Sequence, residues 1–499
     1  MRAFMPPLRR LGAATLASLL AACTTVGPNY RVAAEAVVNR PQAAAQFAAA
    51  ADRNFRSDAL PPQWWRLYHD ATLDGLIAKA FAANTDLRVA AANLERAQAA
   101  VREVEGAREP ELALKAAPGY GRPSAVSLAQ PAAFSDSYNY DVGAAVSYQV
   151  DLVGKITRAV EAASADAEAA QAAADLAHVM VAAHTAAAYV DNCATGQQIA
   201  VAQKSVDTQR EFANLTQQRV TAGRGNVLET SRAQAQLEQL RSALPSLLAA
   251  HRVAQYRLSV LTGEVPGQLA PQLDACVAPP VLAQPIPVGD GAALLRRRPD
   301  IRQAERGVAS ASARIGVATA ALYPSISLGL SVGSTGLVDE FGAGNAFRWG
   351  LGPLISWSLP SAGTHSRIAQ AQAADVAAVA RFDAAVLKAL LETESALTTY
   401  ARELDRNAAL RAARDQSALA SRQSAELYRY GRTDFLTTLD AERTLASAES
   451  ALAASDGKLA SDQVTLFMAL GGGWEQEGAV QTAQPQSPER SAPPARHAD

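Results

Sequence analysis

The sequence of 499 residues has little of several features that mark common protein classes. Three cysteines are too few for a disulfide scaffold, and no Cys-x-x-Cys or paired Cys/His spacing indicates a structural metal. The 46 basic residues do not outnumber the 48 acidic ones, so no positive field favours nucleic acid. Beyond the N-terminus, no apolar run reaches the roughly 18 residues of a spanning helix. We therefore expect no nucleic-acid partner, and any membrane span must be built from strands.

The first 22 residues have the layout of a secretory signal peptide. A basic start is followed by an apolar stretch over 11–20 and by Leu20-Ala21-Ala22-Cys23, which resembles the bacterial lipobox. In that motif the cysteine thiol receives a diacylglycerol before cleavage, so Cys23 is the predicted lipid anchor on a membrane. Thr24 after it implies sorting to the outer membrane. The alternative is an ordinary Ala-x-Ala cleavage with an incidental cysteine.

An internal repeat organises the chain. Two halves, 68–263 and 290–471, carry matching residues in the same order, so each should fold as helix, strand pair, helix, turn and helix. The boundaries leave a lipidated segment (23–67), a linker (264–289) and a polar tail (472–499) whose composition is typical of disorder. The matches include Asp86/Asp300, Pro110/Pro324, Gly154/Gly363, Gly223/Gly431, Leu228/Leu436 and Gly263/Gly471.

Alternating sequences predict one strand pair in each half. Apolar residues at even positions from 138 to 150 alternate with polar ones, and 347–359 repeats this pattern, although Pro353 interrupts it. Partner strands are expected at 112–120 and 325–332, about as long as a tilted membrane strand. A small soluble sheet is the alternative. Aromatic residues near the ends of the apolar rows favour the membrane.

Four strands cannot close a membrane barrel, because the smallest known ones have about eight. An open edge in lipid would leave backbone groups unpaired, at several kcal/mol each. The chain should therefore oligomerise, and three copies would give a twelve-stranded barrel.

The remaining sequence is alanine-rich and has the spacing of coiled-coil helices. Almost nothing interrupts a helix from Lys155 to Arg219, which at 1.5 Å per residue would reach roughly 100 Å. Gly223 and Gly431 supply the turns at which each long helix doubles back. Pro245 should kink the first hairpin, whereas its repeat partner is an alanine.

The sequence also carries a set of short motifs: Cys23, Val26-Gly27-Pro28-Asn29-Tyr30, Trp64-Trp65, Arg298-Pro299-Asp300-Ile301, Tyr323-Pro324, Gly431 to Arg443 and Leu470-Gly471-Gly472-Gly473-Trp474. In this order on a duplicated chain, they resemble the TolC family of outer-membrane efflux channels, specifically its lipoprotein branch. The resemblance covers the chain from the signal peptide to about residue 474. It implies a mixed membrane α+β fold, in which a trimeric, twelve-stranded outer-membrane barrel is continued by a twelve-helix periplasmic α-barrel.

The same resemblance implies a passive exit duct for drugs or other small molecules. Its partners would be further copies of the chain in a homotrimer, a periplasmic adaptor, an inner-membrane pump and outer-membrane lipid. No enzymatic activity, cofactor or metal is expected. Two alternatives stay open: the same channel serving type I protein secretion or metal export, and a structural periplasmic lipoprotein whose coiled coil spans a gap without a pore.

The resemblance also implies a gate at the periplasmic tip, built from tyrosine, arginine and aspartate. By position relative to the second turn, the matching residues are Tyr428 and Asp440, with Arg443 one helical turn beyond. Arg232 and Arg432 are candidate counter-charges, which the resemblance does not fix. The alternative is that these charges are simply solvated at a helix tip.

Three patterns look like chemistry but lack its context. Gly329–Gly333 matches the GxSxG of hydrolases, yet it lies in an alternating strand rather than a strand-to-helix turn. His178 and His184 are six residues apart, lie on different helix faces and cannot form an i, i+4 metal pair. Cys193 and Cys276 could pair in an oxidising periplasm, but nothing in the sequence places them within reach, so we expect them to stay unpaired.

Overall fold

The computed structural model describes residues 25–122, 135–267, 273–282, 285–359 and 361–473. The predicted lipid anchor Cys23 and the signal peptide lie outside the described residues. The chain divides into two compact units, each assembled from both halves of the sequence. Unit 1 comprises Met1–Ala44, Arg88–Ala174 and Pro299–Ala389, and unit 2 comprises Ala45–Leu87, Asp175–Arg298 and Leu390–Asp499.

Both halves show the predicted order of helix, strand pair, long helix, turn and returning helix, so this expectation is confirmed. The first half contains α3 (Ala71–Ala83), α4 (Thr85–Gly106), β2 (Glu111–Gly121), β3 (Ser137–Val150), α5 (Lys155–Thr221), α6 (Val227–Arg241) and α7 (Leu244–Leu261). The second half contains α8 (Gly291–Arg297), α9 (Pro299–Ala320), β5 (Ser325–Leu337), β6 (Phe347–Ser356), α10 (Ala362–Arg429) and α11 (Phe435–Ala469). Shorter elements are α2 (Pro41–Ala44), β1 (Phe55–Arg56) and β4 (Ile286–Pro287).

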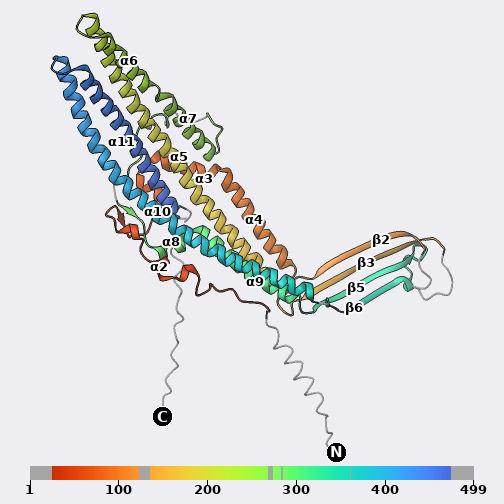
Figure 1. The fold of residues 1–499 in the computed structure, drawn as a ribbon. Coiled ribbons are helices and arrows are strands. Elements are labelled where there is room, and N and C mark those ends of the chain that lie inside the picture. The colour runs from red at the N-terminus through yellow and green to blue at the C-terminus, as the bar shows by residue number, and fades with distance from the viewer. Residues whose placement is uncertain (1–24, 123–134, 268–272, 283–284, 360, 474–499) are drawn as a thin grey trace, which may run out of the picture. The chain divides into compact units, whose positions relative to one another are not determined.

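Unit 1 contains an antiparallel sheet in the order β2-β3-β5-β6, whose strands Figure 1 shows side by side. Its register collects most of the large apolar residues of all four strands on one face, because successive side chains of a strand point to opposite faces. One apolar row is Leu112, Val146, Leu330 and Leu351, and the adjacent row on the other face is Glu111, Ser147, Gly329 and Gly352. Within this single chain the apolar face is open, with Leu112 63% and Leu351 74% exposed.

The expectation that Pro353 interrupts its strand is wrong. β6 continues through Pro353, and β2 continues through Pro118 in the same way. Within a single chain, both strands are edges of the sheet, where the missing N–H of proline is tolerated. The alternating pattern could not show this, because it does not say which strand lies at an edge.

The two helical hairpins differ at one proline, as predicted. α6 ends at Arg241 and α7 begins at Leu244, with Pro245 in the first turn of α7. The missing N–H of proline is tolerated there, whereas within a continuous helix it would break a backbone hydrogen bond. α11 has Ala453 at the corresponding position and is unbroken. In the described part of the chain, no helix combines the length and apolarity needed to cross a bilayer.

Unit 2 is built around two adjacent tryptophans. Trp64 is fully buried and stacks on Phe467, with ring centroids 4.6 Å apart, while Trp65 meets Trp64 edge-on at 5.8 Å. The chain passes so close that a Cβ on Gly472 would lie 2.7 Å from the Leu60 side chain. The tryptophan and glycine motifs, at opposite ends of the sequence, therefore form one packing unit.

Cys193 on α5 and Cys276 in the linker form a disulfide, so the expectation that they stay unpaired is wrong. The linker folds back onto α5 beside Gly196, where an added Cβ would overlap with the carbonyl oxygen of Cys276. The missing side chain lets the two backbones approach. The sequence does not reveal this contact, because it joins positions 83 residues apart through tertiary packing.

Candidate functional site

The turns that end α5 and α10, named here the first and second tip turns, have the same construction. Gly223 and Gly431 take the left-handed conformation, with φ of 64° and 69°. In each turn the residue after the glycine, Arg224 or Arg432, donates its N–H to the carbonyl five residues back, at 2.8 Å. This is the Schellman arrangement, which satisfies the last carbonyls of a helix. The predicted turn glycines are confirmed.

The returning helices each begin at a side-chain cap. Asn226 accepts from the N–H of Leu228 at 3.0 Å, and Asp434 accepts from the N–H of Thr437 at 2.9 Å. Hydrogen bonds from Thr437 hold the pKa of Asp434 below its ordinary value. Caps of this kind stabilise a helix start by about 0.5–2 kcal/mol. Both tip turns are therefore well-defined structures within a single chain.

Tyr428, a predicted gate residue, lies under the second tip turn and is only 3% exposed. Its ring packs against Phe212 and Phe435, with centroids 5.8 and 6.4 Å away. The Arg219 guanidinium lies 4.2 Å from the ring centroid and donates to the Tyr428 carbonyl at 3.3 Å. Burial raises the pKa of Tyr428 above its ordinary value. Within a single chain, this tyrosine therefore joins α5 to α10.

The charged gate residues lie on the surface. Asp440 is exposed on α11, and no described residue forms a hydrogen bond or ion pair with its carboxylate. Arg443 donates to Gln236 of α6 at 2.8 Å rather than to Asp440. Arg232 and Arg432 are both exposed. The structure thus places all four charges near the helical tips but pairs none of them with another in a single chain.

Residues Thr25–Tyr30, named here the N-terminal strap, are held in unit 1 by a buried arginine of α5. Arg158 has only 4% of its side chain exposed. Its Nε donates to the carbonyl of Val26 at 3.0 Å, and its Nη2 donates to Gly27 at 3.3 Å and to Asn29 Oδ1 at 2.7 Å. Its Nη1 pairs with Glu161 at 2.7 Å. All three nitrogens of the guanidinium thus donate to the strap or to one carboxylate.

Two further residues of the strap are fixed by close contacts. Gly27 has φ of 88°, and a Cβ there would overlap with the backbone of Gly316 on α9. Tyr30 donates its hydroxyl to Glu305 at 3.1 Å. Burial, together with this carboxylate, raises the pKa of Tyr30 to about 12. These contacts give a structural reason for the Gly and Tyr of the Val-Gly-Pro-Asn-Tyr motif.

The polar face of the sheet carries a charge cluster over a glycine floor. Asp141 of β3 accepts from Lys115 at 2.7 Å and also pairs with Arg348 of β6. Arg348 reaches Asp141 across Gly143 and Gly333, which leave room for its side chain. Together with the apolar rows described above, this cluster shows that the sheet has one polar and one apolar face.

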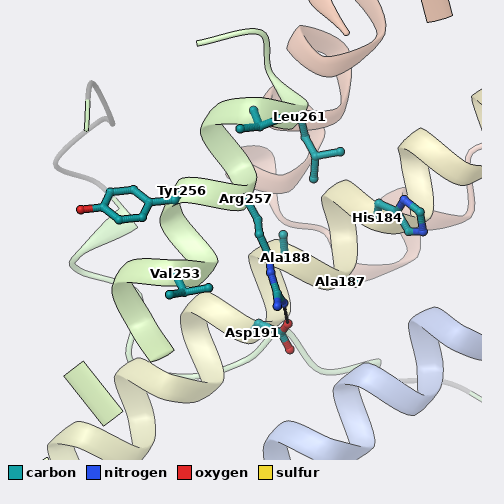
Figure 2. Close-up of a pocket in the computed structure, with 9 residues that line it drawn as sticks. His184, Ala187, Ala188, Asp191, Val253, Tyr256, Arg257 and Leu261 are labelled. Atoms are coloured by element: carbon teal, nitrogen blue, oxygen red, sulfur yellow. Dashed lines mark ion pairs between the residues drawn. The ribbon is translucent and has the colours of Figure 1, made fainter. Parts of the chain in front are cut away.

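Unit 2 has a pocket of about 500 Å³ between α5 and α7 (Figure 2). Its one ion pair joins Arg257 and Asp191, with 3.6 Å between Nη1 and Oδ2. Burial raises the pKa of Asp191, and Arg257 offsets part of this shift. The lining is mainly apolar, consisting of His184, Ala187, Ala188, Asp191, Val253, Tyr256, Arg257, Val260 and Leu261.

The apparent hydrolase motif lies inside the sheet. Ser331 belongs to β5 and is paired with Ala145 on one side and Gly350 on the other. It therefore lacks the sharp strand-to-helix turn that exposes a catalytic serine. Among the described residues, no group of three or more His, Cys, Asp or Glu side chains is arranged to hold a metal.

Sequence reasoning missed Arg219, Phe212 and Arg158. The signal for Phe212 was an aromatic residue on an alanine-rich helix, about two and a half turns before the helix ends at Thr221. Arg219 and Arg158 were indistinguishable from the many solvated arginines of helices, because their partners come from other parts of the chain.

The pattern of the family described as "Outer membrane efflux protein" matches residues 76–264 and 292–472. The chain belongs to this family. The two matched segments correspond to the two halves found by internal comparison, and together they contain the sheet, the long helices and both tip turns.

Other outer membrane efflux proteins match over most of their length. The chain is 28% identical over 462 residues to Nodulation protein T of Rhizobium leguminosarum bv. trifolii, covering 92% of this chain and 96% of that one. It is 30% identical over 443 residues to the toluene efflux pump outer membrane protein TtgC of Pseudomonas putida, covering 85% and 88%. The solved structure of the outer-membrane channel OprN superposes with a TM-score of 0.82 at 34% identity, covering 90% and 99%.

As an outer membrane efflux protein, the chain is the outer-membrane channel component of an efflux pump. Its relatives are channel proteins rather than enzymes. The resemblance inferred from the sequence motifs is confirmed. The sheet and the helical hairpins are the parts from which such a channel is made.

Proposed function

We propose that three copies of this chain form a twelve-stranded outer-membrane barrel continued by a twelve-helix α-barrel. The supporting observation is the exposed apolar face of a sheet whose edges are β2 and β6. In lipid, each unpaired edge group costs several kcal/mol. Pairing β6 of one copy with β2 of the next removes both edges. Because each copy supplies an even number of alternating strands, every new pair is also antiparallel.

Extraction and mass measurement test the assembly. The protein should leave outer-membrane fractions only with detergent, have the protein mass of three chains and show threefold symmetry in electron micrographs. A monomer that stays dispersed without detergent would contradict the proposal. Pairing between protomers can be tested separately by cysteine substitutions at facing positions of β2 and β6, which should cross-link chains in the trimer.

The lipid anchor is proposed at Cys23, three residues before Val26. The Val26 N–H donates at 3.0 Å to the carbonyl of Val153, just after β3 ends. Three extended residues span at most about 11 Å, so acyl chains on Cys23 would enter the bilayer beside this end of the sheet. Mass spectrometry of the mature N-terminal peptide should find a lipidated cysteine, and an unmodified Cys23 refutes the anchor.

The proposed segments of the whole chain are a signal peptide (1–22), a lipidated segment (23–67), repeat 1 (68–263), a linker (264–289), repeat 2 (290–471) and a C-terminal tail (472–499).

The assembled channel is proposed to be a passive exit duct for small organic molecules, docked onto a periplasmic adaptor and an inner-membrane pump. The name of the relative TtgC, a toluene efflux pump protein, supports such a cargo. A deletion strain should become sensitive to solvents, dyes and antibiotics. Sensitivity to metal salts alone, or loss of a secreted protein, would instead point to metal export or type I secretion. Absence of conductance in planar bilayers would favour a structural lipoprotein.

The gate is proposed at the tip turns, with Asp440 as the charge that faces the axis. Three copies of an exposed, unpaired carboxylate around a narrow pore would repel one another and favour cations. The buried contacts of Tyr428 support a role in holding the second tip turn in place. Arg443 ties α11 to α6 through Gln236, and Arg232 and Arg432 are the counter-charges available to a neighbouring copy.

A further inference from the structure

The linker between the two repeats is fastened to α5 by several independent contacts. Cys193 is fully buried, and its Cα lies 4.8 Å from that of Cys276. Asn192 donates from Nδ2 to the carbonyl of Leu273 at 2.8 Å, and the Leu273 side chain is itself buried in the core of unit 2. The two cysteines therefore meet where residues 273–276 of the linker contact α5, a site named here the linker seat.

The seat continues on both sides of the cysteine pair. Gln255 of α7, which is also buried, donates from Nε2 to Asp274 at 2.6 Å. Gly196 leaves the space that the Cys276 carbonyl fills, so a larger residue there would push the linker away. Contacts with α5, α7 and the core thus hold residues 273–276 in addition to the covalent bond.

We propose that Cys193 and Cys276 are an oxidative maturation site, at which a protein disulfide donor of the periplasm joins the linker to α5. Cys276 is the partly exposed thiol, so its thiolate attacks the donor disulfide and forms a mixed disulfide. The Cys193 thiolate then displaces the donor sulfur. Two protons and two electrons leave the chain, and the donor is released as a dithiol.

The bond closes a covalent loop of 83 residues that contains the end of α5, the first tip turn, α6 and α7. The chain has only one further cysteine, Cys23, so the hairpin of α10 and α11 has no equivalent clasp. If Cys23 carries the proposed lipid, its sulfur is used and only this pair remains. The hairpin of α5, α6 and α7 is therefore closed by a disulfide, whereas the hairpin of α10 and α11 is not.

Thiol labelling of the full-length protein tests the proposal directly. Protein extracted in detergent without reductant is denatured and treated with a maleimide before or after reduction. Cys193 and Cys276 should label only after reduction, and a disulfide-linked peptide pair 2 Da lighter than the two free peptides should be found. Complete labelling of both thiols without reduction would overturn the proposal, whatever the channel activity.

The effect on stability gives a second measurement. Loop closure of this size corresponds to roughly a thousandfold in the folding equilibrium. Reductant should lower the thermal midpoint of the wild type by on the order of 5–10 °C and leave C193A/C276A unchanged. An equal midpoint with and without reductant in the wild type would contradict a stabilising role. Bilayer conductance should be the same in both proteins, which separates this proposal from the channel function.

The glycine seat can be tested with a matched pair of variants. Gly196→Ala should increase the fraction of free thiol, because the new Cβ overlaps with the linker backbone. Gly75→Ala on α3, where nothing lies within 4 Å of the added Cβ, is the control and should leave the disulfide intact. Full oxidation of Gly196→Ala would show that the seat does not position Cys276.

Discussion

Replacing Arg158 by alanine should release the N-terminal strap while leaving the sheet intact. The two short hydrogen bonds from the guanidinium go to Val26 and Asn29, at 3.0 and 2.7 Å. Hydrogen bonds to a charged group contribute about 1.5–3 kcal/mol each, so the strap should lose about 3–6 kcal/mol of docking free energy. This corresponds to a change of roughly 10²- to 10⁴-fold in the population of released strap.

Amide hydrogen exchange of the detergent-solubilised protein, read by mass spectrometry, measures this change. The N–H of Val26 is bonded to Val153 and should exchange slowly in the wild type and much faster in Arg158→Ala. Arg158→Lys keeps the charge but not the planar fork, so its exchange rate should lie between the two.

The control is Arg314→Ala in the same unit. Arg314 is 60% exposed and pairs with Asp166, which is 44% exposed, so its removal should change local stability by no more than about 1 kcal/mol. Equal exchange at Val26 in Arg158→Ala and Arg314→Ala would refute the assignment of Arg158 as the residue that holds the strap.

Three further predictions concern the sheet, the tip and pH. Leu330→Lys should make the free energy of insertion into liposomes about 2–4 kcal/mol less favourable, because the residue lies on the apolar face. Ser331→Lys, on the other face, is the control and should insert like the wild type. Equal insertion of the two variants would argue against a lipid-facing row. Asp440→Ala should raise single-channel conductance and reduce cation preference in planar bilayers, and an unchanged conductance would contradict a gating role. Burial raises the pKa of Glu442 above its ordinary value of 4.5. Its ionised form therefore destabilises the fold at neutral pH, and this effect fades as pH falls through the raised pKa towards 4.5. Glu442→Gln should thus raise the thermal midpoint at pH 7 and lose this advantage near pH 4.5; a midpoint difference that does not change with pH would show that Glu442 is not the group responsible.

The parts of the fold that depend on neighbours in the chain were predictable. The strands at 137–150 and 347–356 follow from alternation, since the side-chain period of a strand is two. The tip turns at Gly223 and Gly431 follow from the left-handed backbone that favours glycine. The break near Pro245 follows from the missing backbone N–H.

The contacts of the candidate site were less predictable. Tyr428 was selected by position, but its burial under Arg219 depends on how α5 and α10 pack. Arg443 was placed one helical turn beyond Asp440, and the sequence did not show that its side chain binds Gln236 on a different helix. Residues that share a helix turn in the sequence can thus have their partners on separate elements.

The amino-acid sequence by itself determined the duplicated order of helices and strands, the polar and apolar faces of the sheet and the positions of the turns. These are local properties, set by residue periodicity and backbone preference. Only the tertiary structure decided that Cys193 meets Cys276, that Pro353 lies on an edge strand and that Arg158 holds the strap. Each of these depends on packing between segments far apart in the chain. The missing side chain of Gly196 lets the linker approach α5, and the position of β6 in the sheet makes it an edge strand of the single chain.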